Sequence, residues 1–166
     1  MSSRGFVGWA CERGSRVVDT TLTYVDSSVL LRSYLAAEPG HAEARALIED
    51  ERLLVTATFT LIEVTSTLVR ARHSKGLPDA DILIEKLHEE VSPDGPINLA
   101  RADVAATESA ALTIVRHYAL GPLEAMHLAV ADLVVRQLTE PGEQVGFATH
   151  RQSQRRAAKA LGFVPI

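Results

Sequence analysis

Apolar and polar residues in the first half of the chain switch repeatedly between strand and helix spacing. Residues 22–25 are rich in β-forming side chains, and the apolar residues after DSS recur at helical spacing, which predicts a strand and then a helix. Pro39 and Gly40 end that helix, and a short amphipathic helix is predicted over residues 41–50. A second strand, residues 53–56, leads into TFTLIEVTSTLVRARHSKG, whose apolar residues keep helical spacing up to the Gly76 stop.

The second half of the chain continues this alternation. Pro78 precedes the amphipathic segment DADILIEKLHEEV, and the turn SPDGP separates that predicted helix from a short predicted strand, INL. Helical spacing follows over residues 102–117, and Gly121 and Pro122 separate this helix from the next. The remaining predicted elements are a helix over residues 123–137, a strand over 145–149, a basic helix over 151–161 and a last strand in FVPI.

Strands that alternate with helices imply right-handed crossovers and a mostly parallel sheet covered on both faces, so the predicted fold class is α/β. A length of 166 residues suits one domain. Residues 1–16 carry three glycines among scattered charges without a period, and we expect a loose extension there and a single domain over residues 17–166. Ligands of such sheets bind beyond the carboxyl ends of the strands, which is where chemistry is expected.

Composition narrows the class of protein. Hydrophobic residues make up 46% of the chain and charged residues 23%, which suits a globular domain and excludes a mainly disordered one. The longest apolar runs are far shorter than the ~18 residues that a membrane span needs. Cys11 is the only cysteine, and the opening segment lacks a signal-peptide core, so we expect a cytoplasmic protein. With a net charge of −4, any contact with nucleic acid must come from a local basic patch.

Three acidic residues stand at predicted helix starts: Asp26 after the first strand, Glu63 after the second and Glu124 after Pro122. Each has a local explanation. Asp26 is a good N-cap, and Glu63 stands three residues after Thr60, the spacing of a capping box. Glu124 is favoured by the helix macrodipole. None of the three acids alone identifies a site.

The predicted arrangement changes that interpretation, because an α/β sheet aims acids from separate segments at one crevice. Carboxylates held within a few ångströms repel one another, and a hard divalent cation such as Mg²⁺ or Mn²⁺ relieves that repulsion. Such an ion polarises a phosphodiester and lowers the pKa of an attacking water. The acids therefore predict a metal site and metal-dependent phosphodiester hydrolysis.

Four segments, in order, carry a family resemblance: TYVDSSVLLRSYL, TLIEVTSTLVR, LGPLEAMHLAVA and FATHRQSQRRAAKALGFVPI. Together they resemble PIN-domain ribonucleases, particularly VapC-type toxins of bacterial toxin–antitoxin pairs, over residues 22–166. The resemblance implies a three-layer α/β/α sandwich with a mostly parallel sheet of four or five strands. It also implies a Mg²⁺-dependent endoribonuclease, with Mn²⁺ as a substitute, whose partners are an RNA substrate, a cognate antitoxin protein and a second copy of the chain.

Carried over by position, the resemblance makes Asp26, Glu63 and Glu124 the catalytic metal-binding acids, with Glu124 where the family usually has Asp. The family's fourth acid falls at Arg151. An arginine cannot ligate a metal, and its positive charge would weaken metal affinity. Alternatively, Arg151 holds a substrate phosphate by a bidentate contact. The sequence leaves both alternatives open.

Two further residues are candidates for substrate binding beside the acids. Ser28 could hydrogen-bond a carboxylate or a metal-bound water, although serines in a first helical turn usually satisfy backbone groups. Thr149 at a strand end could orient an acid or a water, or simply cap a turn. His127 is interpreted as a packed, hydrogen-bonded histidine outside the catalytic set.

Basic residues cluster near the end of the chain. Arg151 and Arg155 share one face of the predicted helix, and Arg156 and Lys159 lie close by. This helix is either a solvated surface or, as the resemblance implies, a site that receives RNA phosphates.

The leading hypothesis is therefore a metal-dependent endoribonuclease that acts as a toxin. One alternative is a degenerate PIN-fold protein that binds RNA or a protein partner without cleavage, because Arg151 replaces an acid. Another is a flavodoxin-like regulatory or ligand-binding domain whose acids are only helix caps.

Overall fold

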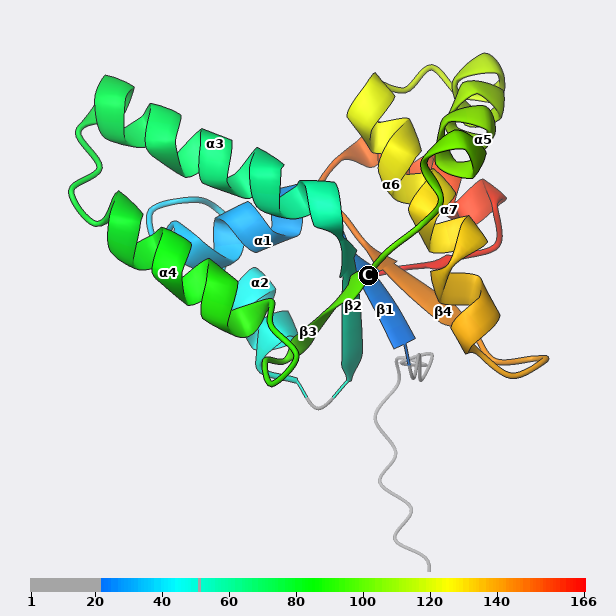
Figure 1. The fold of residues 1–166 in the computed structure, drawn as a ribbon, viewed down its shortest axis with the longest axis horizontal. Coiled ribbons are helices and arrows are strands. Elements are labelled where there is room, and N and C mark those ends of the chain that lie inside the picture. Colours follow the sequence, from blue (N-terminus) through cyan, green and yellow to red (C-terminus); the bar gives the residue numbers. More distant parts are fainter. Residues whose placement is uncertain (1–21, 51) are drawn as a thin grey trace, which may run out of the picture.

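The computed structural model describes residues 22–50 and 52–166. Its strands are β1 (Leu22–Val25), β2 (Leu53–Ala57), β3 (Ile97–Ala100), β4 (Val145–Ala148) and β5 (Val164–Pro165). They form one sheet in the order β3-β2-β1-β4-β5, with parallel neighbours throughout (Figure 1). The predicted parallel sheet is confirmed, whereas the predicted extension over residues 1–16 and the domain start at residue 17 lie outside the described residues.

Helices cover both faces of the sheet, as predicted. The first face carries α1 (Ser27–Tyr34), α2 (His41–Ile48), α3 (Thr58–Lys75) and α4 (Ala80–Glu90). The second carries α5 (Val104–His117), α6 (Pro122–Leu133) and α7 (Gln152–Ala160), with a 3₁₀ turn, η1 (Val135–Leu138), after α6. Figure 1 shows the two groups of helices on either side of the strands, so the fold is a three-layer α/β/α sandwich.

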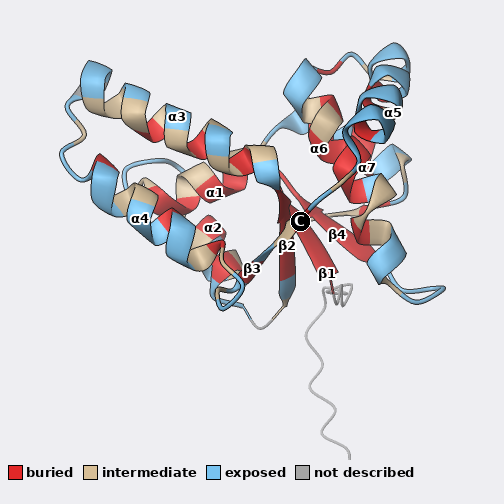
Figure 2. Ribbon diagram, in the orientation of Figure 1, coloured by how far each residue is buried: buried red, intermediate tan, exposed pale blue. Residues whose placement is uncertain are grey.

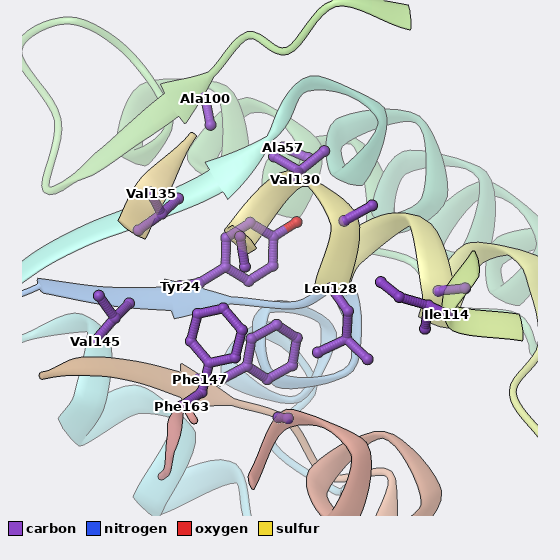
Figure 3. Close-up of a cluster of buried hydrophobic side chains, with 14 of the residues drawn as sticks. Tyr24, Ala57, Ala100, Ile114, Leu128, Val130, Val135, Val145, Phe147 and Phe163 are labelled. Carbon is purple, nitrogen blue, oxygen red and sulfur yellow. The ribbon is translucent and has the colours of Figure 1, made fainter. Parts of the chain in front are cut away.

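Alternation along the strands builds two separate cores, one in each layer of helices. Tyr24 and Phe147 point to the α5–α7 side, where their rings stack with centroids 5.2 Å apart and Phe163 packs beside them (Figure 3). Val25 and Ala148 point to the opposite side, toward α1–α4. Strands β1 and β4 are buried throughout and β2 nearly so, whereas β3 and β5 at the sheet edges are partly exposed, and many exposed residues lie on the outer faces of the helices (Figure 2).

One predicted helix differs from the structure. The segment predicted as a single helix over residues 123–137 consists of α6 and η1, because the Gln137 N–H donates to the Val134 carbonyl three residues earlier instead of four. Val135, at the start of η1, is fully buried in the core. The tighter turn thus brings an apolar side chain into the core at the end of α6.

In the described part of the chain, no single helix has the length and hydropathy to span a membrane, although α5 taken with α6 and η1 passes that test as a pair bent by 118°.

Candidate active site

Asp26 follows β1 and caps α1. Its Oδ1 accepts hydrogen bonds from the backbone N–H groups of Ser28 and Val29, at 3.0 and 3.1 Å, and from the Ser28 hydroxyl at 2.7 Å. The side chain is only 1% exposed. The capping explanation for Asp26 is therefore correct, and it also fixes the carboxylate rotamer at the end of the strand.

The second oxygen of Asp26 connects β1 to β4. The Thr149 hydroxyl, directly after β4, lies 2.8 Å from Asp26 Oδ2 and 2.7 Å from Gln154 Oε1, and it accepts a hydrogen bond from the Arg151 backbone N–H. Gln154 is fully buried, and its amide donates to the Glu124 carbonyl at 3.2 Å. This chain of contacts links Asp26 to the first turn of α6.

Glu63 is held by a histidine from a distant segment. His127 on α6 is 2% exposed, and its Nε2 lies 2.7 Å from Glu63 Oε2, while its Nδ1 lies 2.7 Å from the Tyr24 hydroxyl. Burial, followed by the nearby Asp26 charge, raises the pKa of Tyr24 well above its usual value, so the phenol stays neutral. When the neutral phenol donates to Nδ1 of a neutral His127 ring, the ring carries its proton on Nε2. The Nε2–H group then donates to Glu63.

This contact overturns the capping-box explanation of Glu63. Helix α3 begins at Thr58 with Ala57 as N-cap, so Thr60 lies inside the helix, and its hydroxyl contacts Thr56 at 2.9 Å. The interpretation of His127 as a buried, hydrogen-bonded histidine is confirmed, but its partner is a candidate metal ligand. The i,i+3 spacing of Glu124 and His127 on one helix face was the available signal for this role.

Glu124 has two partners in the structure. Its Oε2 accepts the Gly121 N–H at 2.8 Å, which is one half of a capping box, and its Oε1 lies 3.5 Å from Arg151 Nη1. The Glu124 side chain is 17% exposed and that of Arg151 57%. Arg151, at the position where the resemblance predicts a fourth acid, thus supplies a positive charge to Glu124.

The three predicted acids line the same cavity. Asp26, Glu63 and Glu124 line one cavity of about 330 Å³, which we call the acidic pocket. Ser27, His127, Arg151 and Gln154 are its other polar lining residues. The pocket lies where the ends of β1 and β4 meet, the crevice that ligands of doubly wound sheets use.

Arg155 does not line the acidic pocket. Its Nη1 donates to the carbonyl of the last residue, Ile166, at 2.9 Å. Its role in substrate binding stays a prediction, and the contact seen is a tie between α7 and the end of the chain.

The donor types of the acidic pocket fit a hard divalent cation, because three carboxylates line it. Their present contacts keep them apart. Asp26 is bound by its own helix and Thr149, Glu63 by His127 and Glu124 by Gly121 and Arg151. Across residues 22–50 and 52–166, no three acidic, histidine or cysteine side chains lie close enough to share an ion. The metal site stays a prediction.

A protein-family model and several solved structures match this chain. The family model described as PIN domain matches residues 23–135, a segment that includes all three acids and ends before Thr149 and Arg151. No curated protein sequence matches the chain significantly.

Solved structures share the fold at low sequence identity. VapC20 of Mycobacterium tuberculosis, described as a Sarcin-Ricin loop cleaving toxin, is 20% identical with a TM-score of 0.59, over 86% of this chain and 96% of that one. PAE2754 of Pyrobaculum aerophilum is 14% identical with a TM-score of 0.57, over 86% and 82%. VapBC2 of Rickettsia felis, bound to a DNA fragment from its promoter, is 7% identical with a TM-score of 0.57, over 87% and 97%.

Proposed function

Since the chain belongs to the PIN domain family, we propose that it is a metal-dependent endoribonuclease that acts in the cytoplasm as the toxin of a toxin–antitoxin pair. The observation that carries the proposal is the acidic pocket, where carboxylates from three separate segments meet at the carboxyl ends of the strands. The description of VapC20, a structure of the same fold, as a toxin that cleaves the Sarcin-Ricin loop supports the choice of RNA as substrate. A cognate antitoxin and a second copy of the chain are the proposed protein partners.

Asp26, Glu63 and Glu124 would hold Mg²⁺ or Mn²⁺, which when bound polarises a phosphodiester and lowers the pKa of an attacking water. The residues around the acids hold them in position. Ser28 and the first turn of α1 hold Asp26 in one rotamer, and His127 holds Glu63, which lines the pocket, by its Oε2 atom. Arg151, at the pocket rim, carries the guanidinium that faces a substrate phosphate.

The test is RNA cleavage by Asp26→Asn. Asparagine caps a helix nearly as well as aspartate, so the variant keeps the cap of α1 and loses the carboxylate charge. Its amide nitrogen replaces Oδ2 beside the Thr149 hydroxyl, which can then donate to Gln154 Oε1, and urea unfolding checks that the fold is kept. We expect Mg²⁺-dependent cleavage by the parent, with 5′-phosphate and 3′-hydroxyl ends, and a loss on the order of 100-fold or more in the variant. Gel analysis of labelled RNA, with and without a chelator, measures both.

Asp81→Asn is the matched control, because Asp81 is exposed on α4 and pairs with Arg72 away from the acidic pocket. It should cleave like the parent. Cleavage by Asp26→Asn at the parental rate would refute the assignment of the acids. A pure, folded parent that binds RNA without cutting it would instead support the non-cleaving alternative, with Arg151→Asp as the variant that restores an acid.

A further inference from the structure

A larger cavity, of about 790 Å³, adjoins the acidic pocket. It lies between α1, α3 and the loop after β4, and we call it the α1–α3 groove. Four residues line both cavities: Ser27, Glu63, Leu123 and Arg151. A ligand that enters the groove is therefore continuous with the site of the proposed chemistry.

One face of α3 forms a wall of the groove. Besides the buried Val64, its lining residues recur every three or four positions along the helix: Phe59, Ile62, Glu63, Ser66, Thr67 and Arg70. At a rise of ~1.5 Å per residue, Arg70 lies about 10 Å along the helix from Glu63. On this face, the hydroxyl side chains of Ser66 and Thr67 therefore lie between the acidic pocket and the positive charge of Arg70.

The charges of the groove favour an anion. Its charged lining residues are Arg32, Arg70, Arg151, Glu38 and Glu63. Arg151 and Glu63 also line the acidic pocket, which leaves two arginines and one glutamate in the rest of the groove. No acidic side chain of the described residues forms a salt bridge with Arg32 or Arg70. Their guanidinium groups contact only the Pro39 carbonyl and the Thr67 hydroxyl. Both arginines therefore have unused N–H donors, and no acidic partner among the described residues offsets their positive charge before a ligand binds.

A second observation comes from His150. Within the described residues, the one buried side-chain polar atom without a hydrogen-bond partner is His150 Nε2, and this ring lines the groove. Burial and the nearby charge of Arg32 lower the pKa of His150, so the neutral ring can donate or accept. The unpaired Nε2 atom near Arg32 is a second indication of a polar ligand at this end of the groove.

We propose that single-stranded RNA reaches the acidic pocket along the α1–α3 groove, with Arg70 and Arg32 on its phosphates. The proposal rests on the proposed function and names the path of its substrate. Ile62 and Leu123 are 72% and 45% exposed at the groove, where they offer apolar surface to the faces of unpaired bases. The path runs over α3, because Arg155 on α7 is engaged with the Ile166 carbonyl and lines neither cavity.

The test measures binding without cleavage, so that it does not depend on catalysis. The probe is a short fluorescein-labelled 2′-O-methyl RNA strand, whose anisotropy is followed with the full-length protein at several salt concentrations, without divalent ions. Arg70→Gln should weaken binding on the order of fivefold and lower the slope of log affinity against log salt by about 0.7, the loss of one phosphate contact.

Two matched variants decide the path. Arg72 lies on the same helix but is paired with Asp81 at 2.6 Å, and Arg156 is exposed on α7, so Arg72→Gln and Arg156→Gln should bind like the parent. Equal binding by Arg70→Gln and the parent would overturn the proposal and leave the proposed ribonuclease activity standing. Weakened binding by Arg156→Gln alone would show that the strand binds along α7 instead, which would overturn the proposal. A parent protein that binds no RNA strand would also overturn the proposal.

Discussion

Single side chains of the acidic pocket serve the fold and the site at once. The hydrogen bonds that let Asp26 cap α1 also fix its carboxylate, and the buried ring of His127 aims Glu63. Tyr24 completes this arrangement from the core, where its ring stacks on Phe147 and its hydroxyl reaches His127. The orientation of one acid thus depends on a hydroxyl that lies wholly inside the protein.

Tyr24→Phe isolates that dependence. The substitution keeps the ring stacked on Phe147 but leaves His127 Nδ1 without its partner, which should lower the free energy of unfolding by about 1–3 kcal/mol. With His127 less restrained, we expect cleavage and Mn²⁺ affinity to fall several-fold, measured by calorimetric titration alongside urea unfolding. Tyr118→Phe is the control, since Tyr118 lies outside the acidic pocket. Lower stability with unchanged Mn²⁺ affinity would show that Tyr24 contributes to core packing and does not position Glu63.

The three acids could be proposed from sequence, because Asp26 and Glu63 follow a change from strand to helix spacing and Glu124 follows the helix break at Gly121 and Pro122. It could not find their partners. Glu63 and His127 are 64 positions apart, and a capping box at Thr60 was the only local explanation that spacing offered. Gln154, which connects Thr149 to Glu124, gives no signal in sequence, because a buried glutamine within a basic helix looks like any solvated residue.

At the scale of elements, strand order explains where the site lies. From β1 the chain passes to β2 on one side, and β4 joins on the other side, so the ends of β1 and β4 open a crevice between the two helical layers. Asp26 and Thr149 stand at those two ends. Helix α6 then supplies Glu124 and His127 from the second layer, and its buried alanines belong to the same core as Tyr24 and Phe147.

The buried alanines of α6 predict that this helix is sensitive to added side-chain volume. Ala129 is fully buried, so Ala129→Leu should overpack the core and destabilise the protein by about 1–3 kcal/mol, read from urea unfolding. It should also reduce cleavage, because displacement of α6 moves Glu124 and His127. Ala105→Leu, on the exposed side of α5, should change neither property appreciably. Parental stability in Ala129→Leu would contradict the tight packing of this helix.

Elements were predictable where a period or a turn signal was strong. The alternation of strands and helices predicted the parallel sheet, and Gly121 with Pro122 marked the start of α6. The end of α6 was not predictable, because apolar residues continue at helical spacing through Val135 while the backbone tightens into η1. That change follows from burial of Val135 in the core, which is a tertiary effect.

At the scale of the whole molecule, charge is divided between two adjoining cavities. The net charge is −4, yet the acidic pocket sits beside a groove with three arginines. An acidic protein can therefore attract a cation and a polyanion at neighbouring sites. The proposed cleavage requires a divalent cation in the acidic pocket, and this requirement is the central claim.

Thermal unfolding with and without millimolar Mn²⁺ or Mg²⁺, on the parent, Glu63→Gln and the Asp81→Asn control, tests that claim most directly. At a hundredfold excess over Kd, binding to the folded state adds about 2.7 kcal/mol, or roughly 5–10 °C in Tm for a chain of this size. We predict this rise in the parent and the control and its loss in Glu63→Gln, which keeps an oxygen for His127 but lacks the charge. No shift in the parent, together with a more stable Glu63→Gln through relieved repulsion, would contradict the claim.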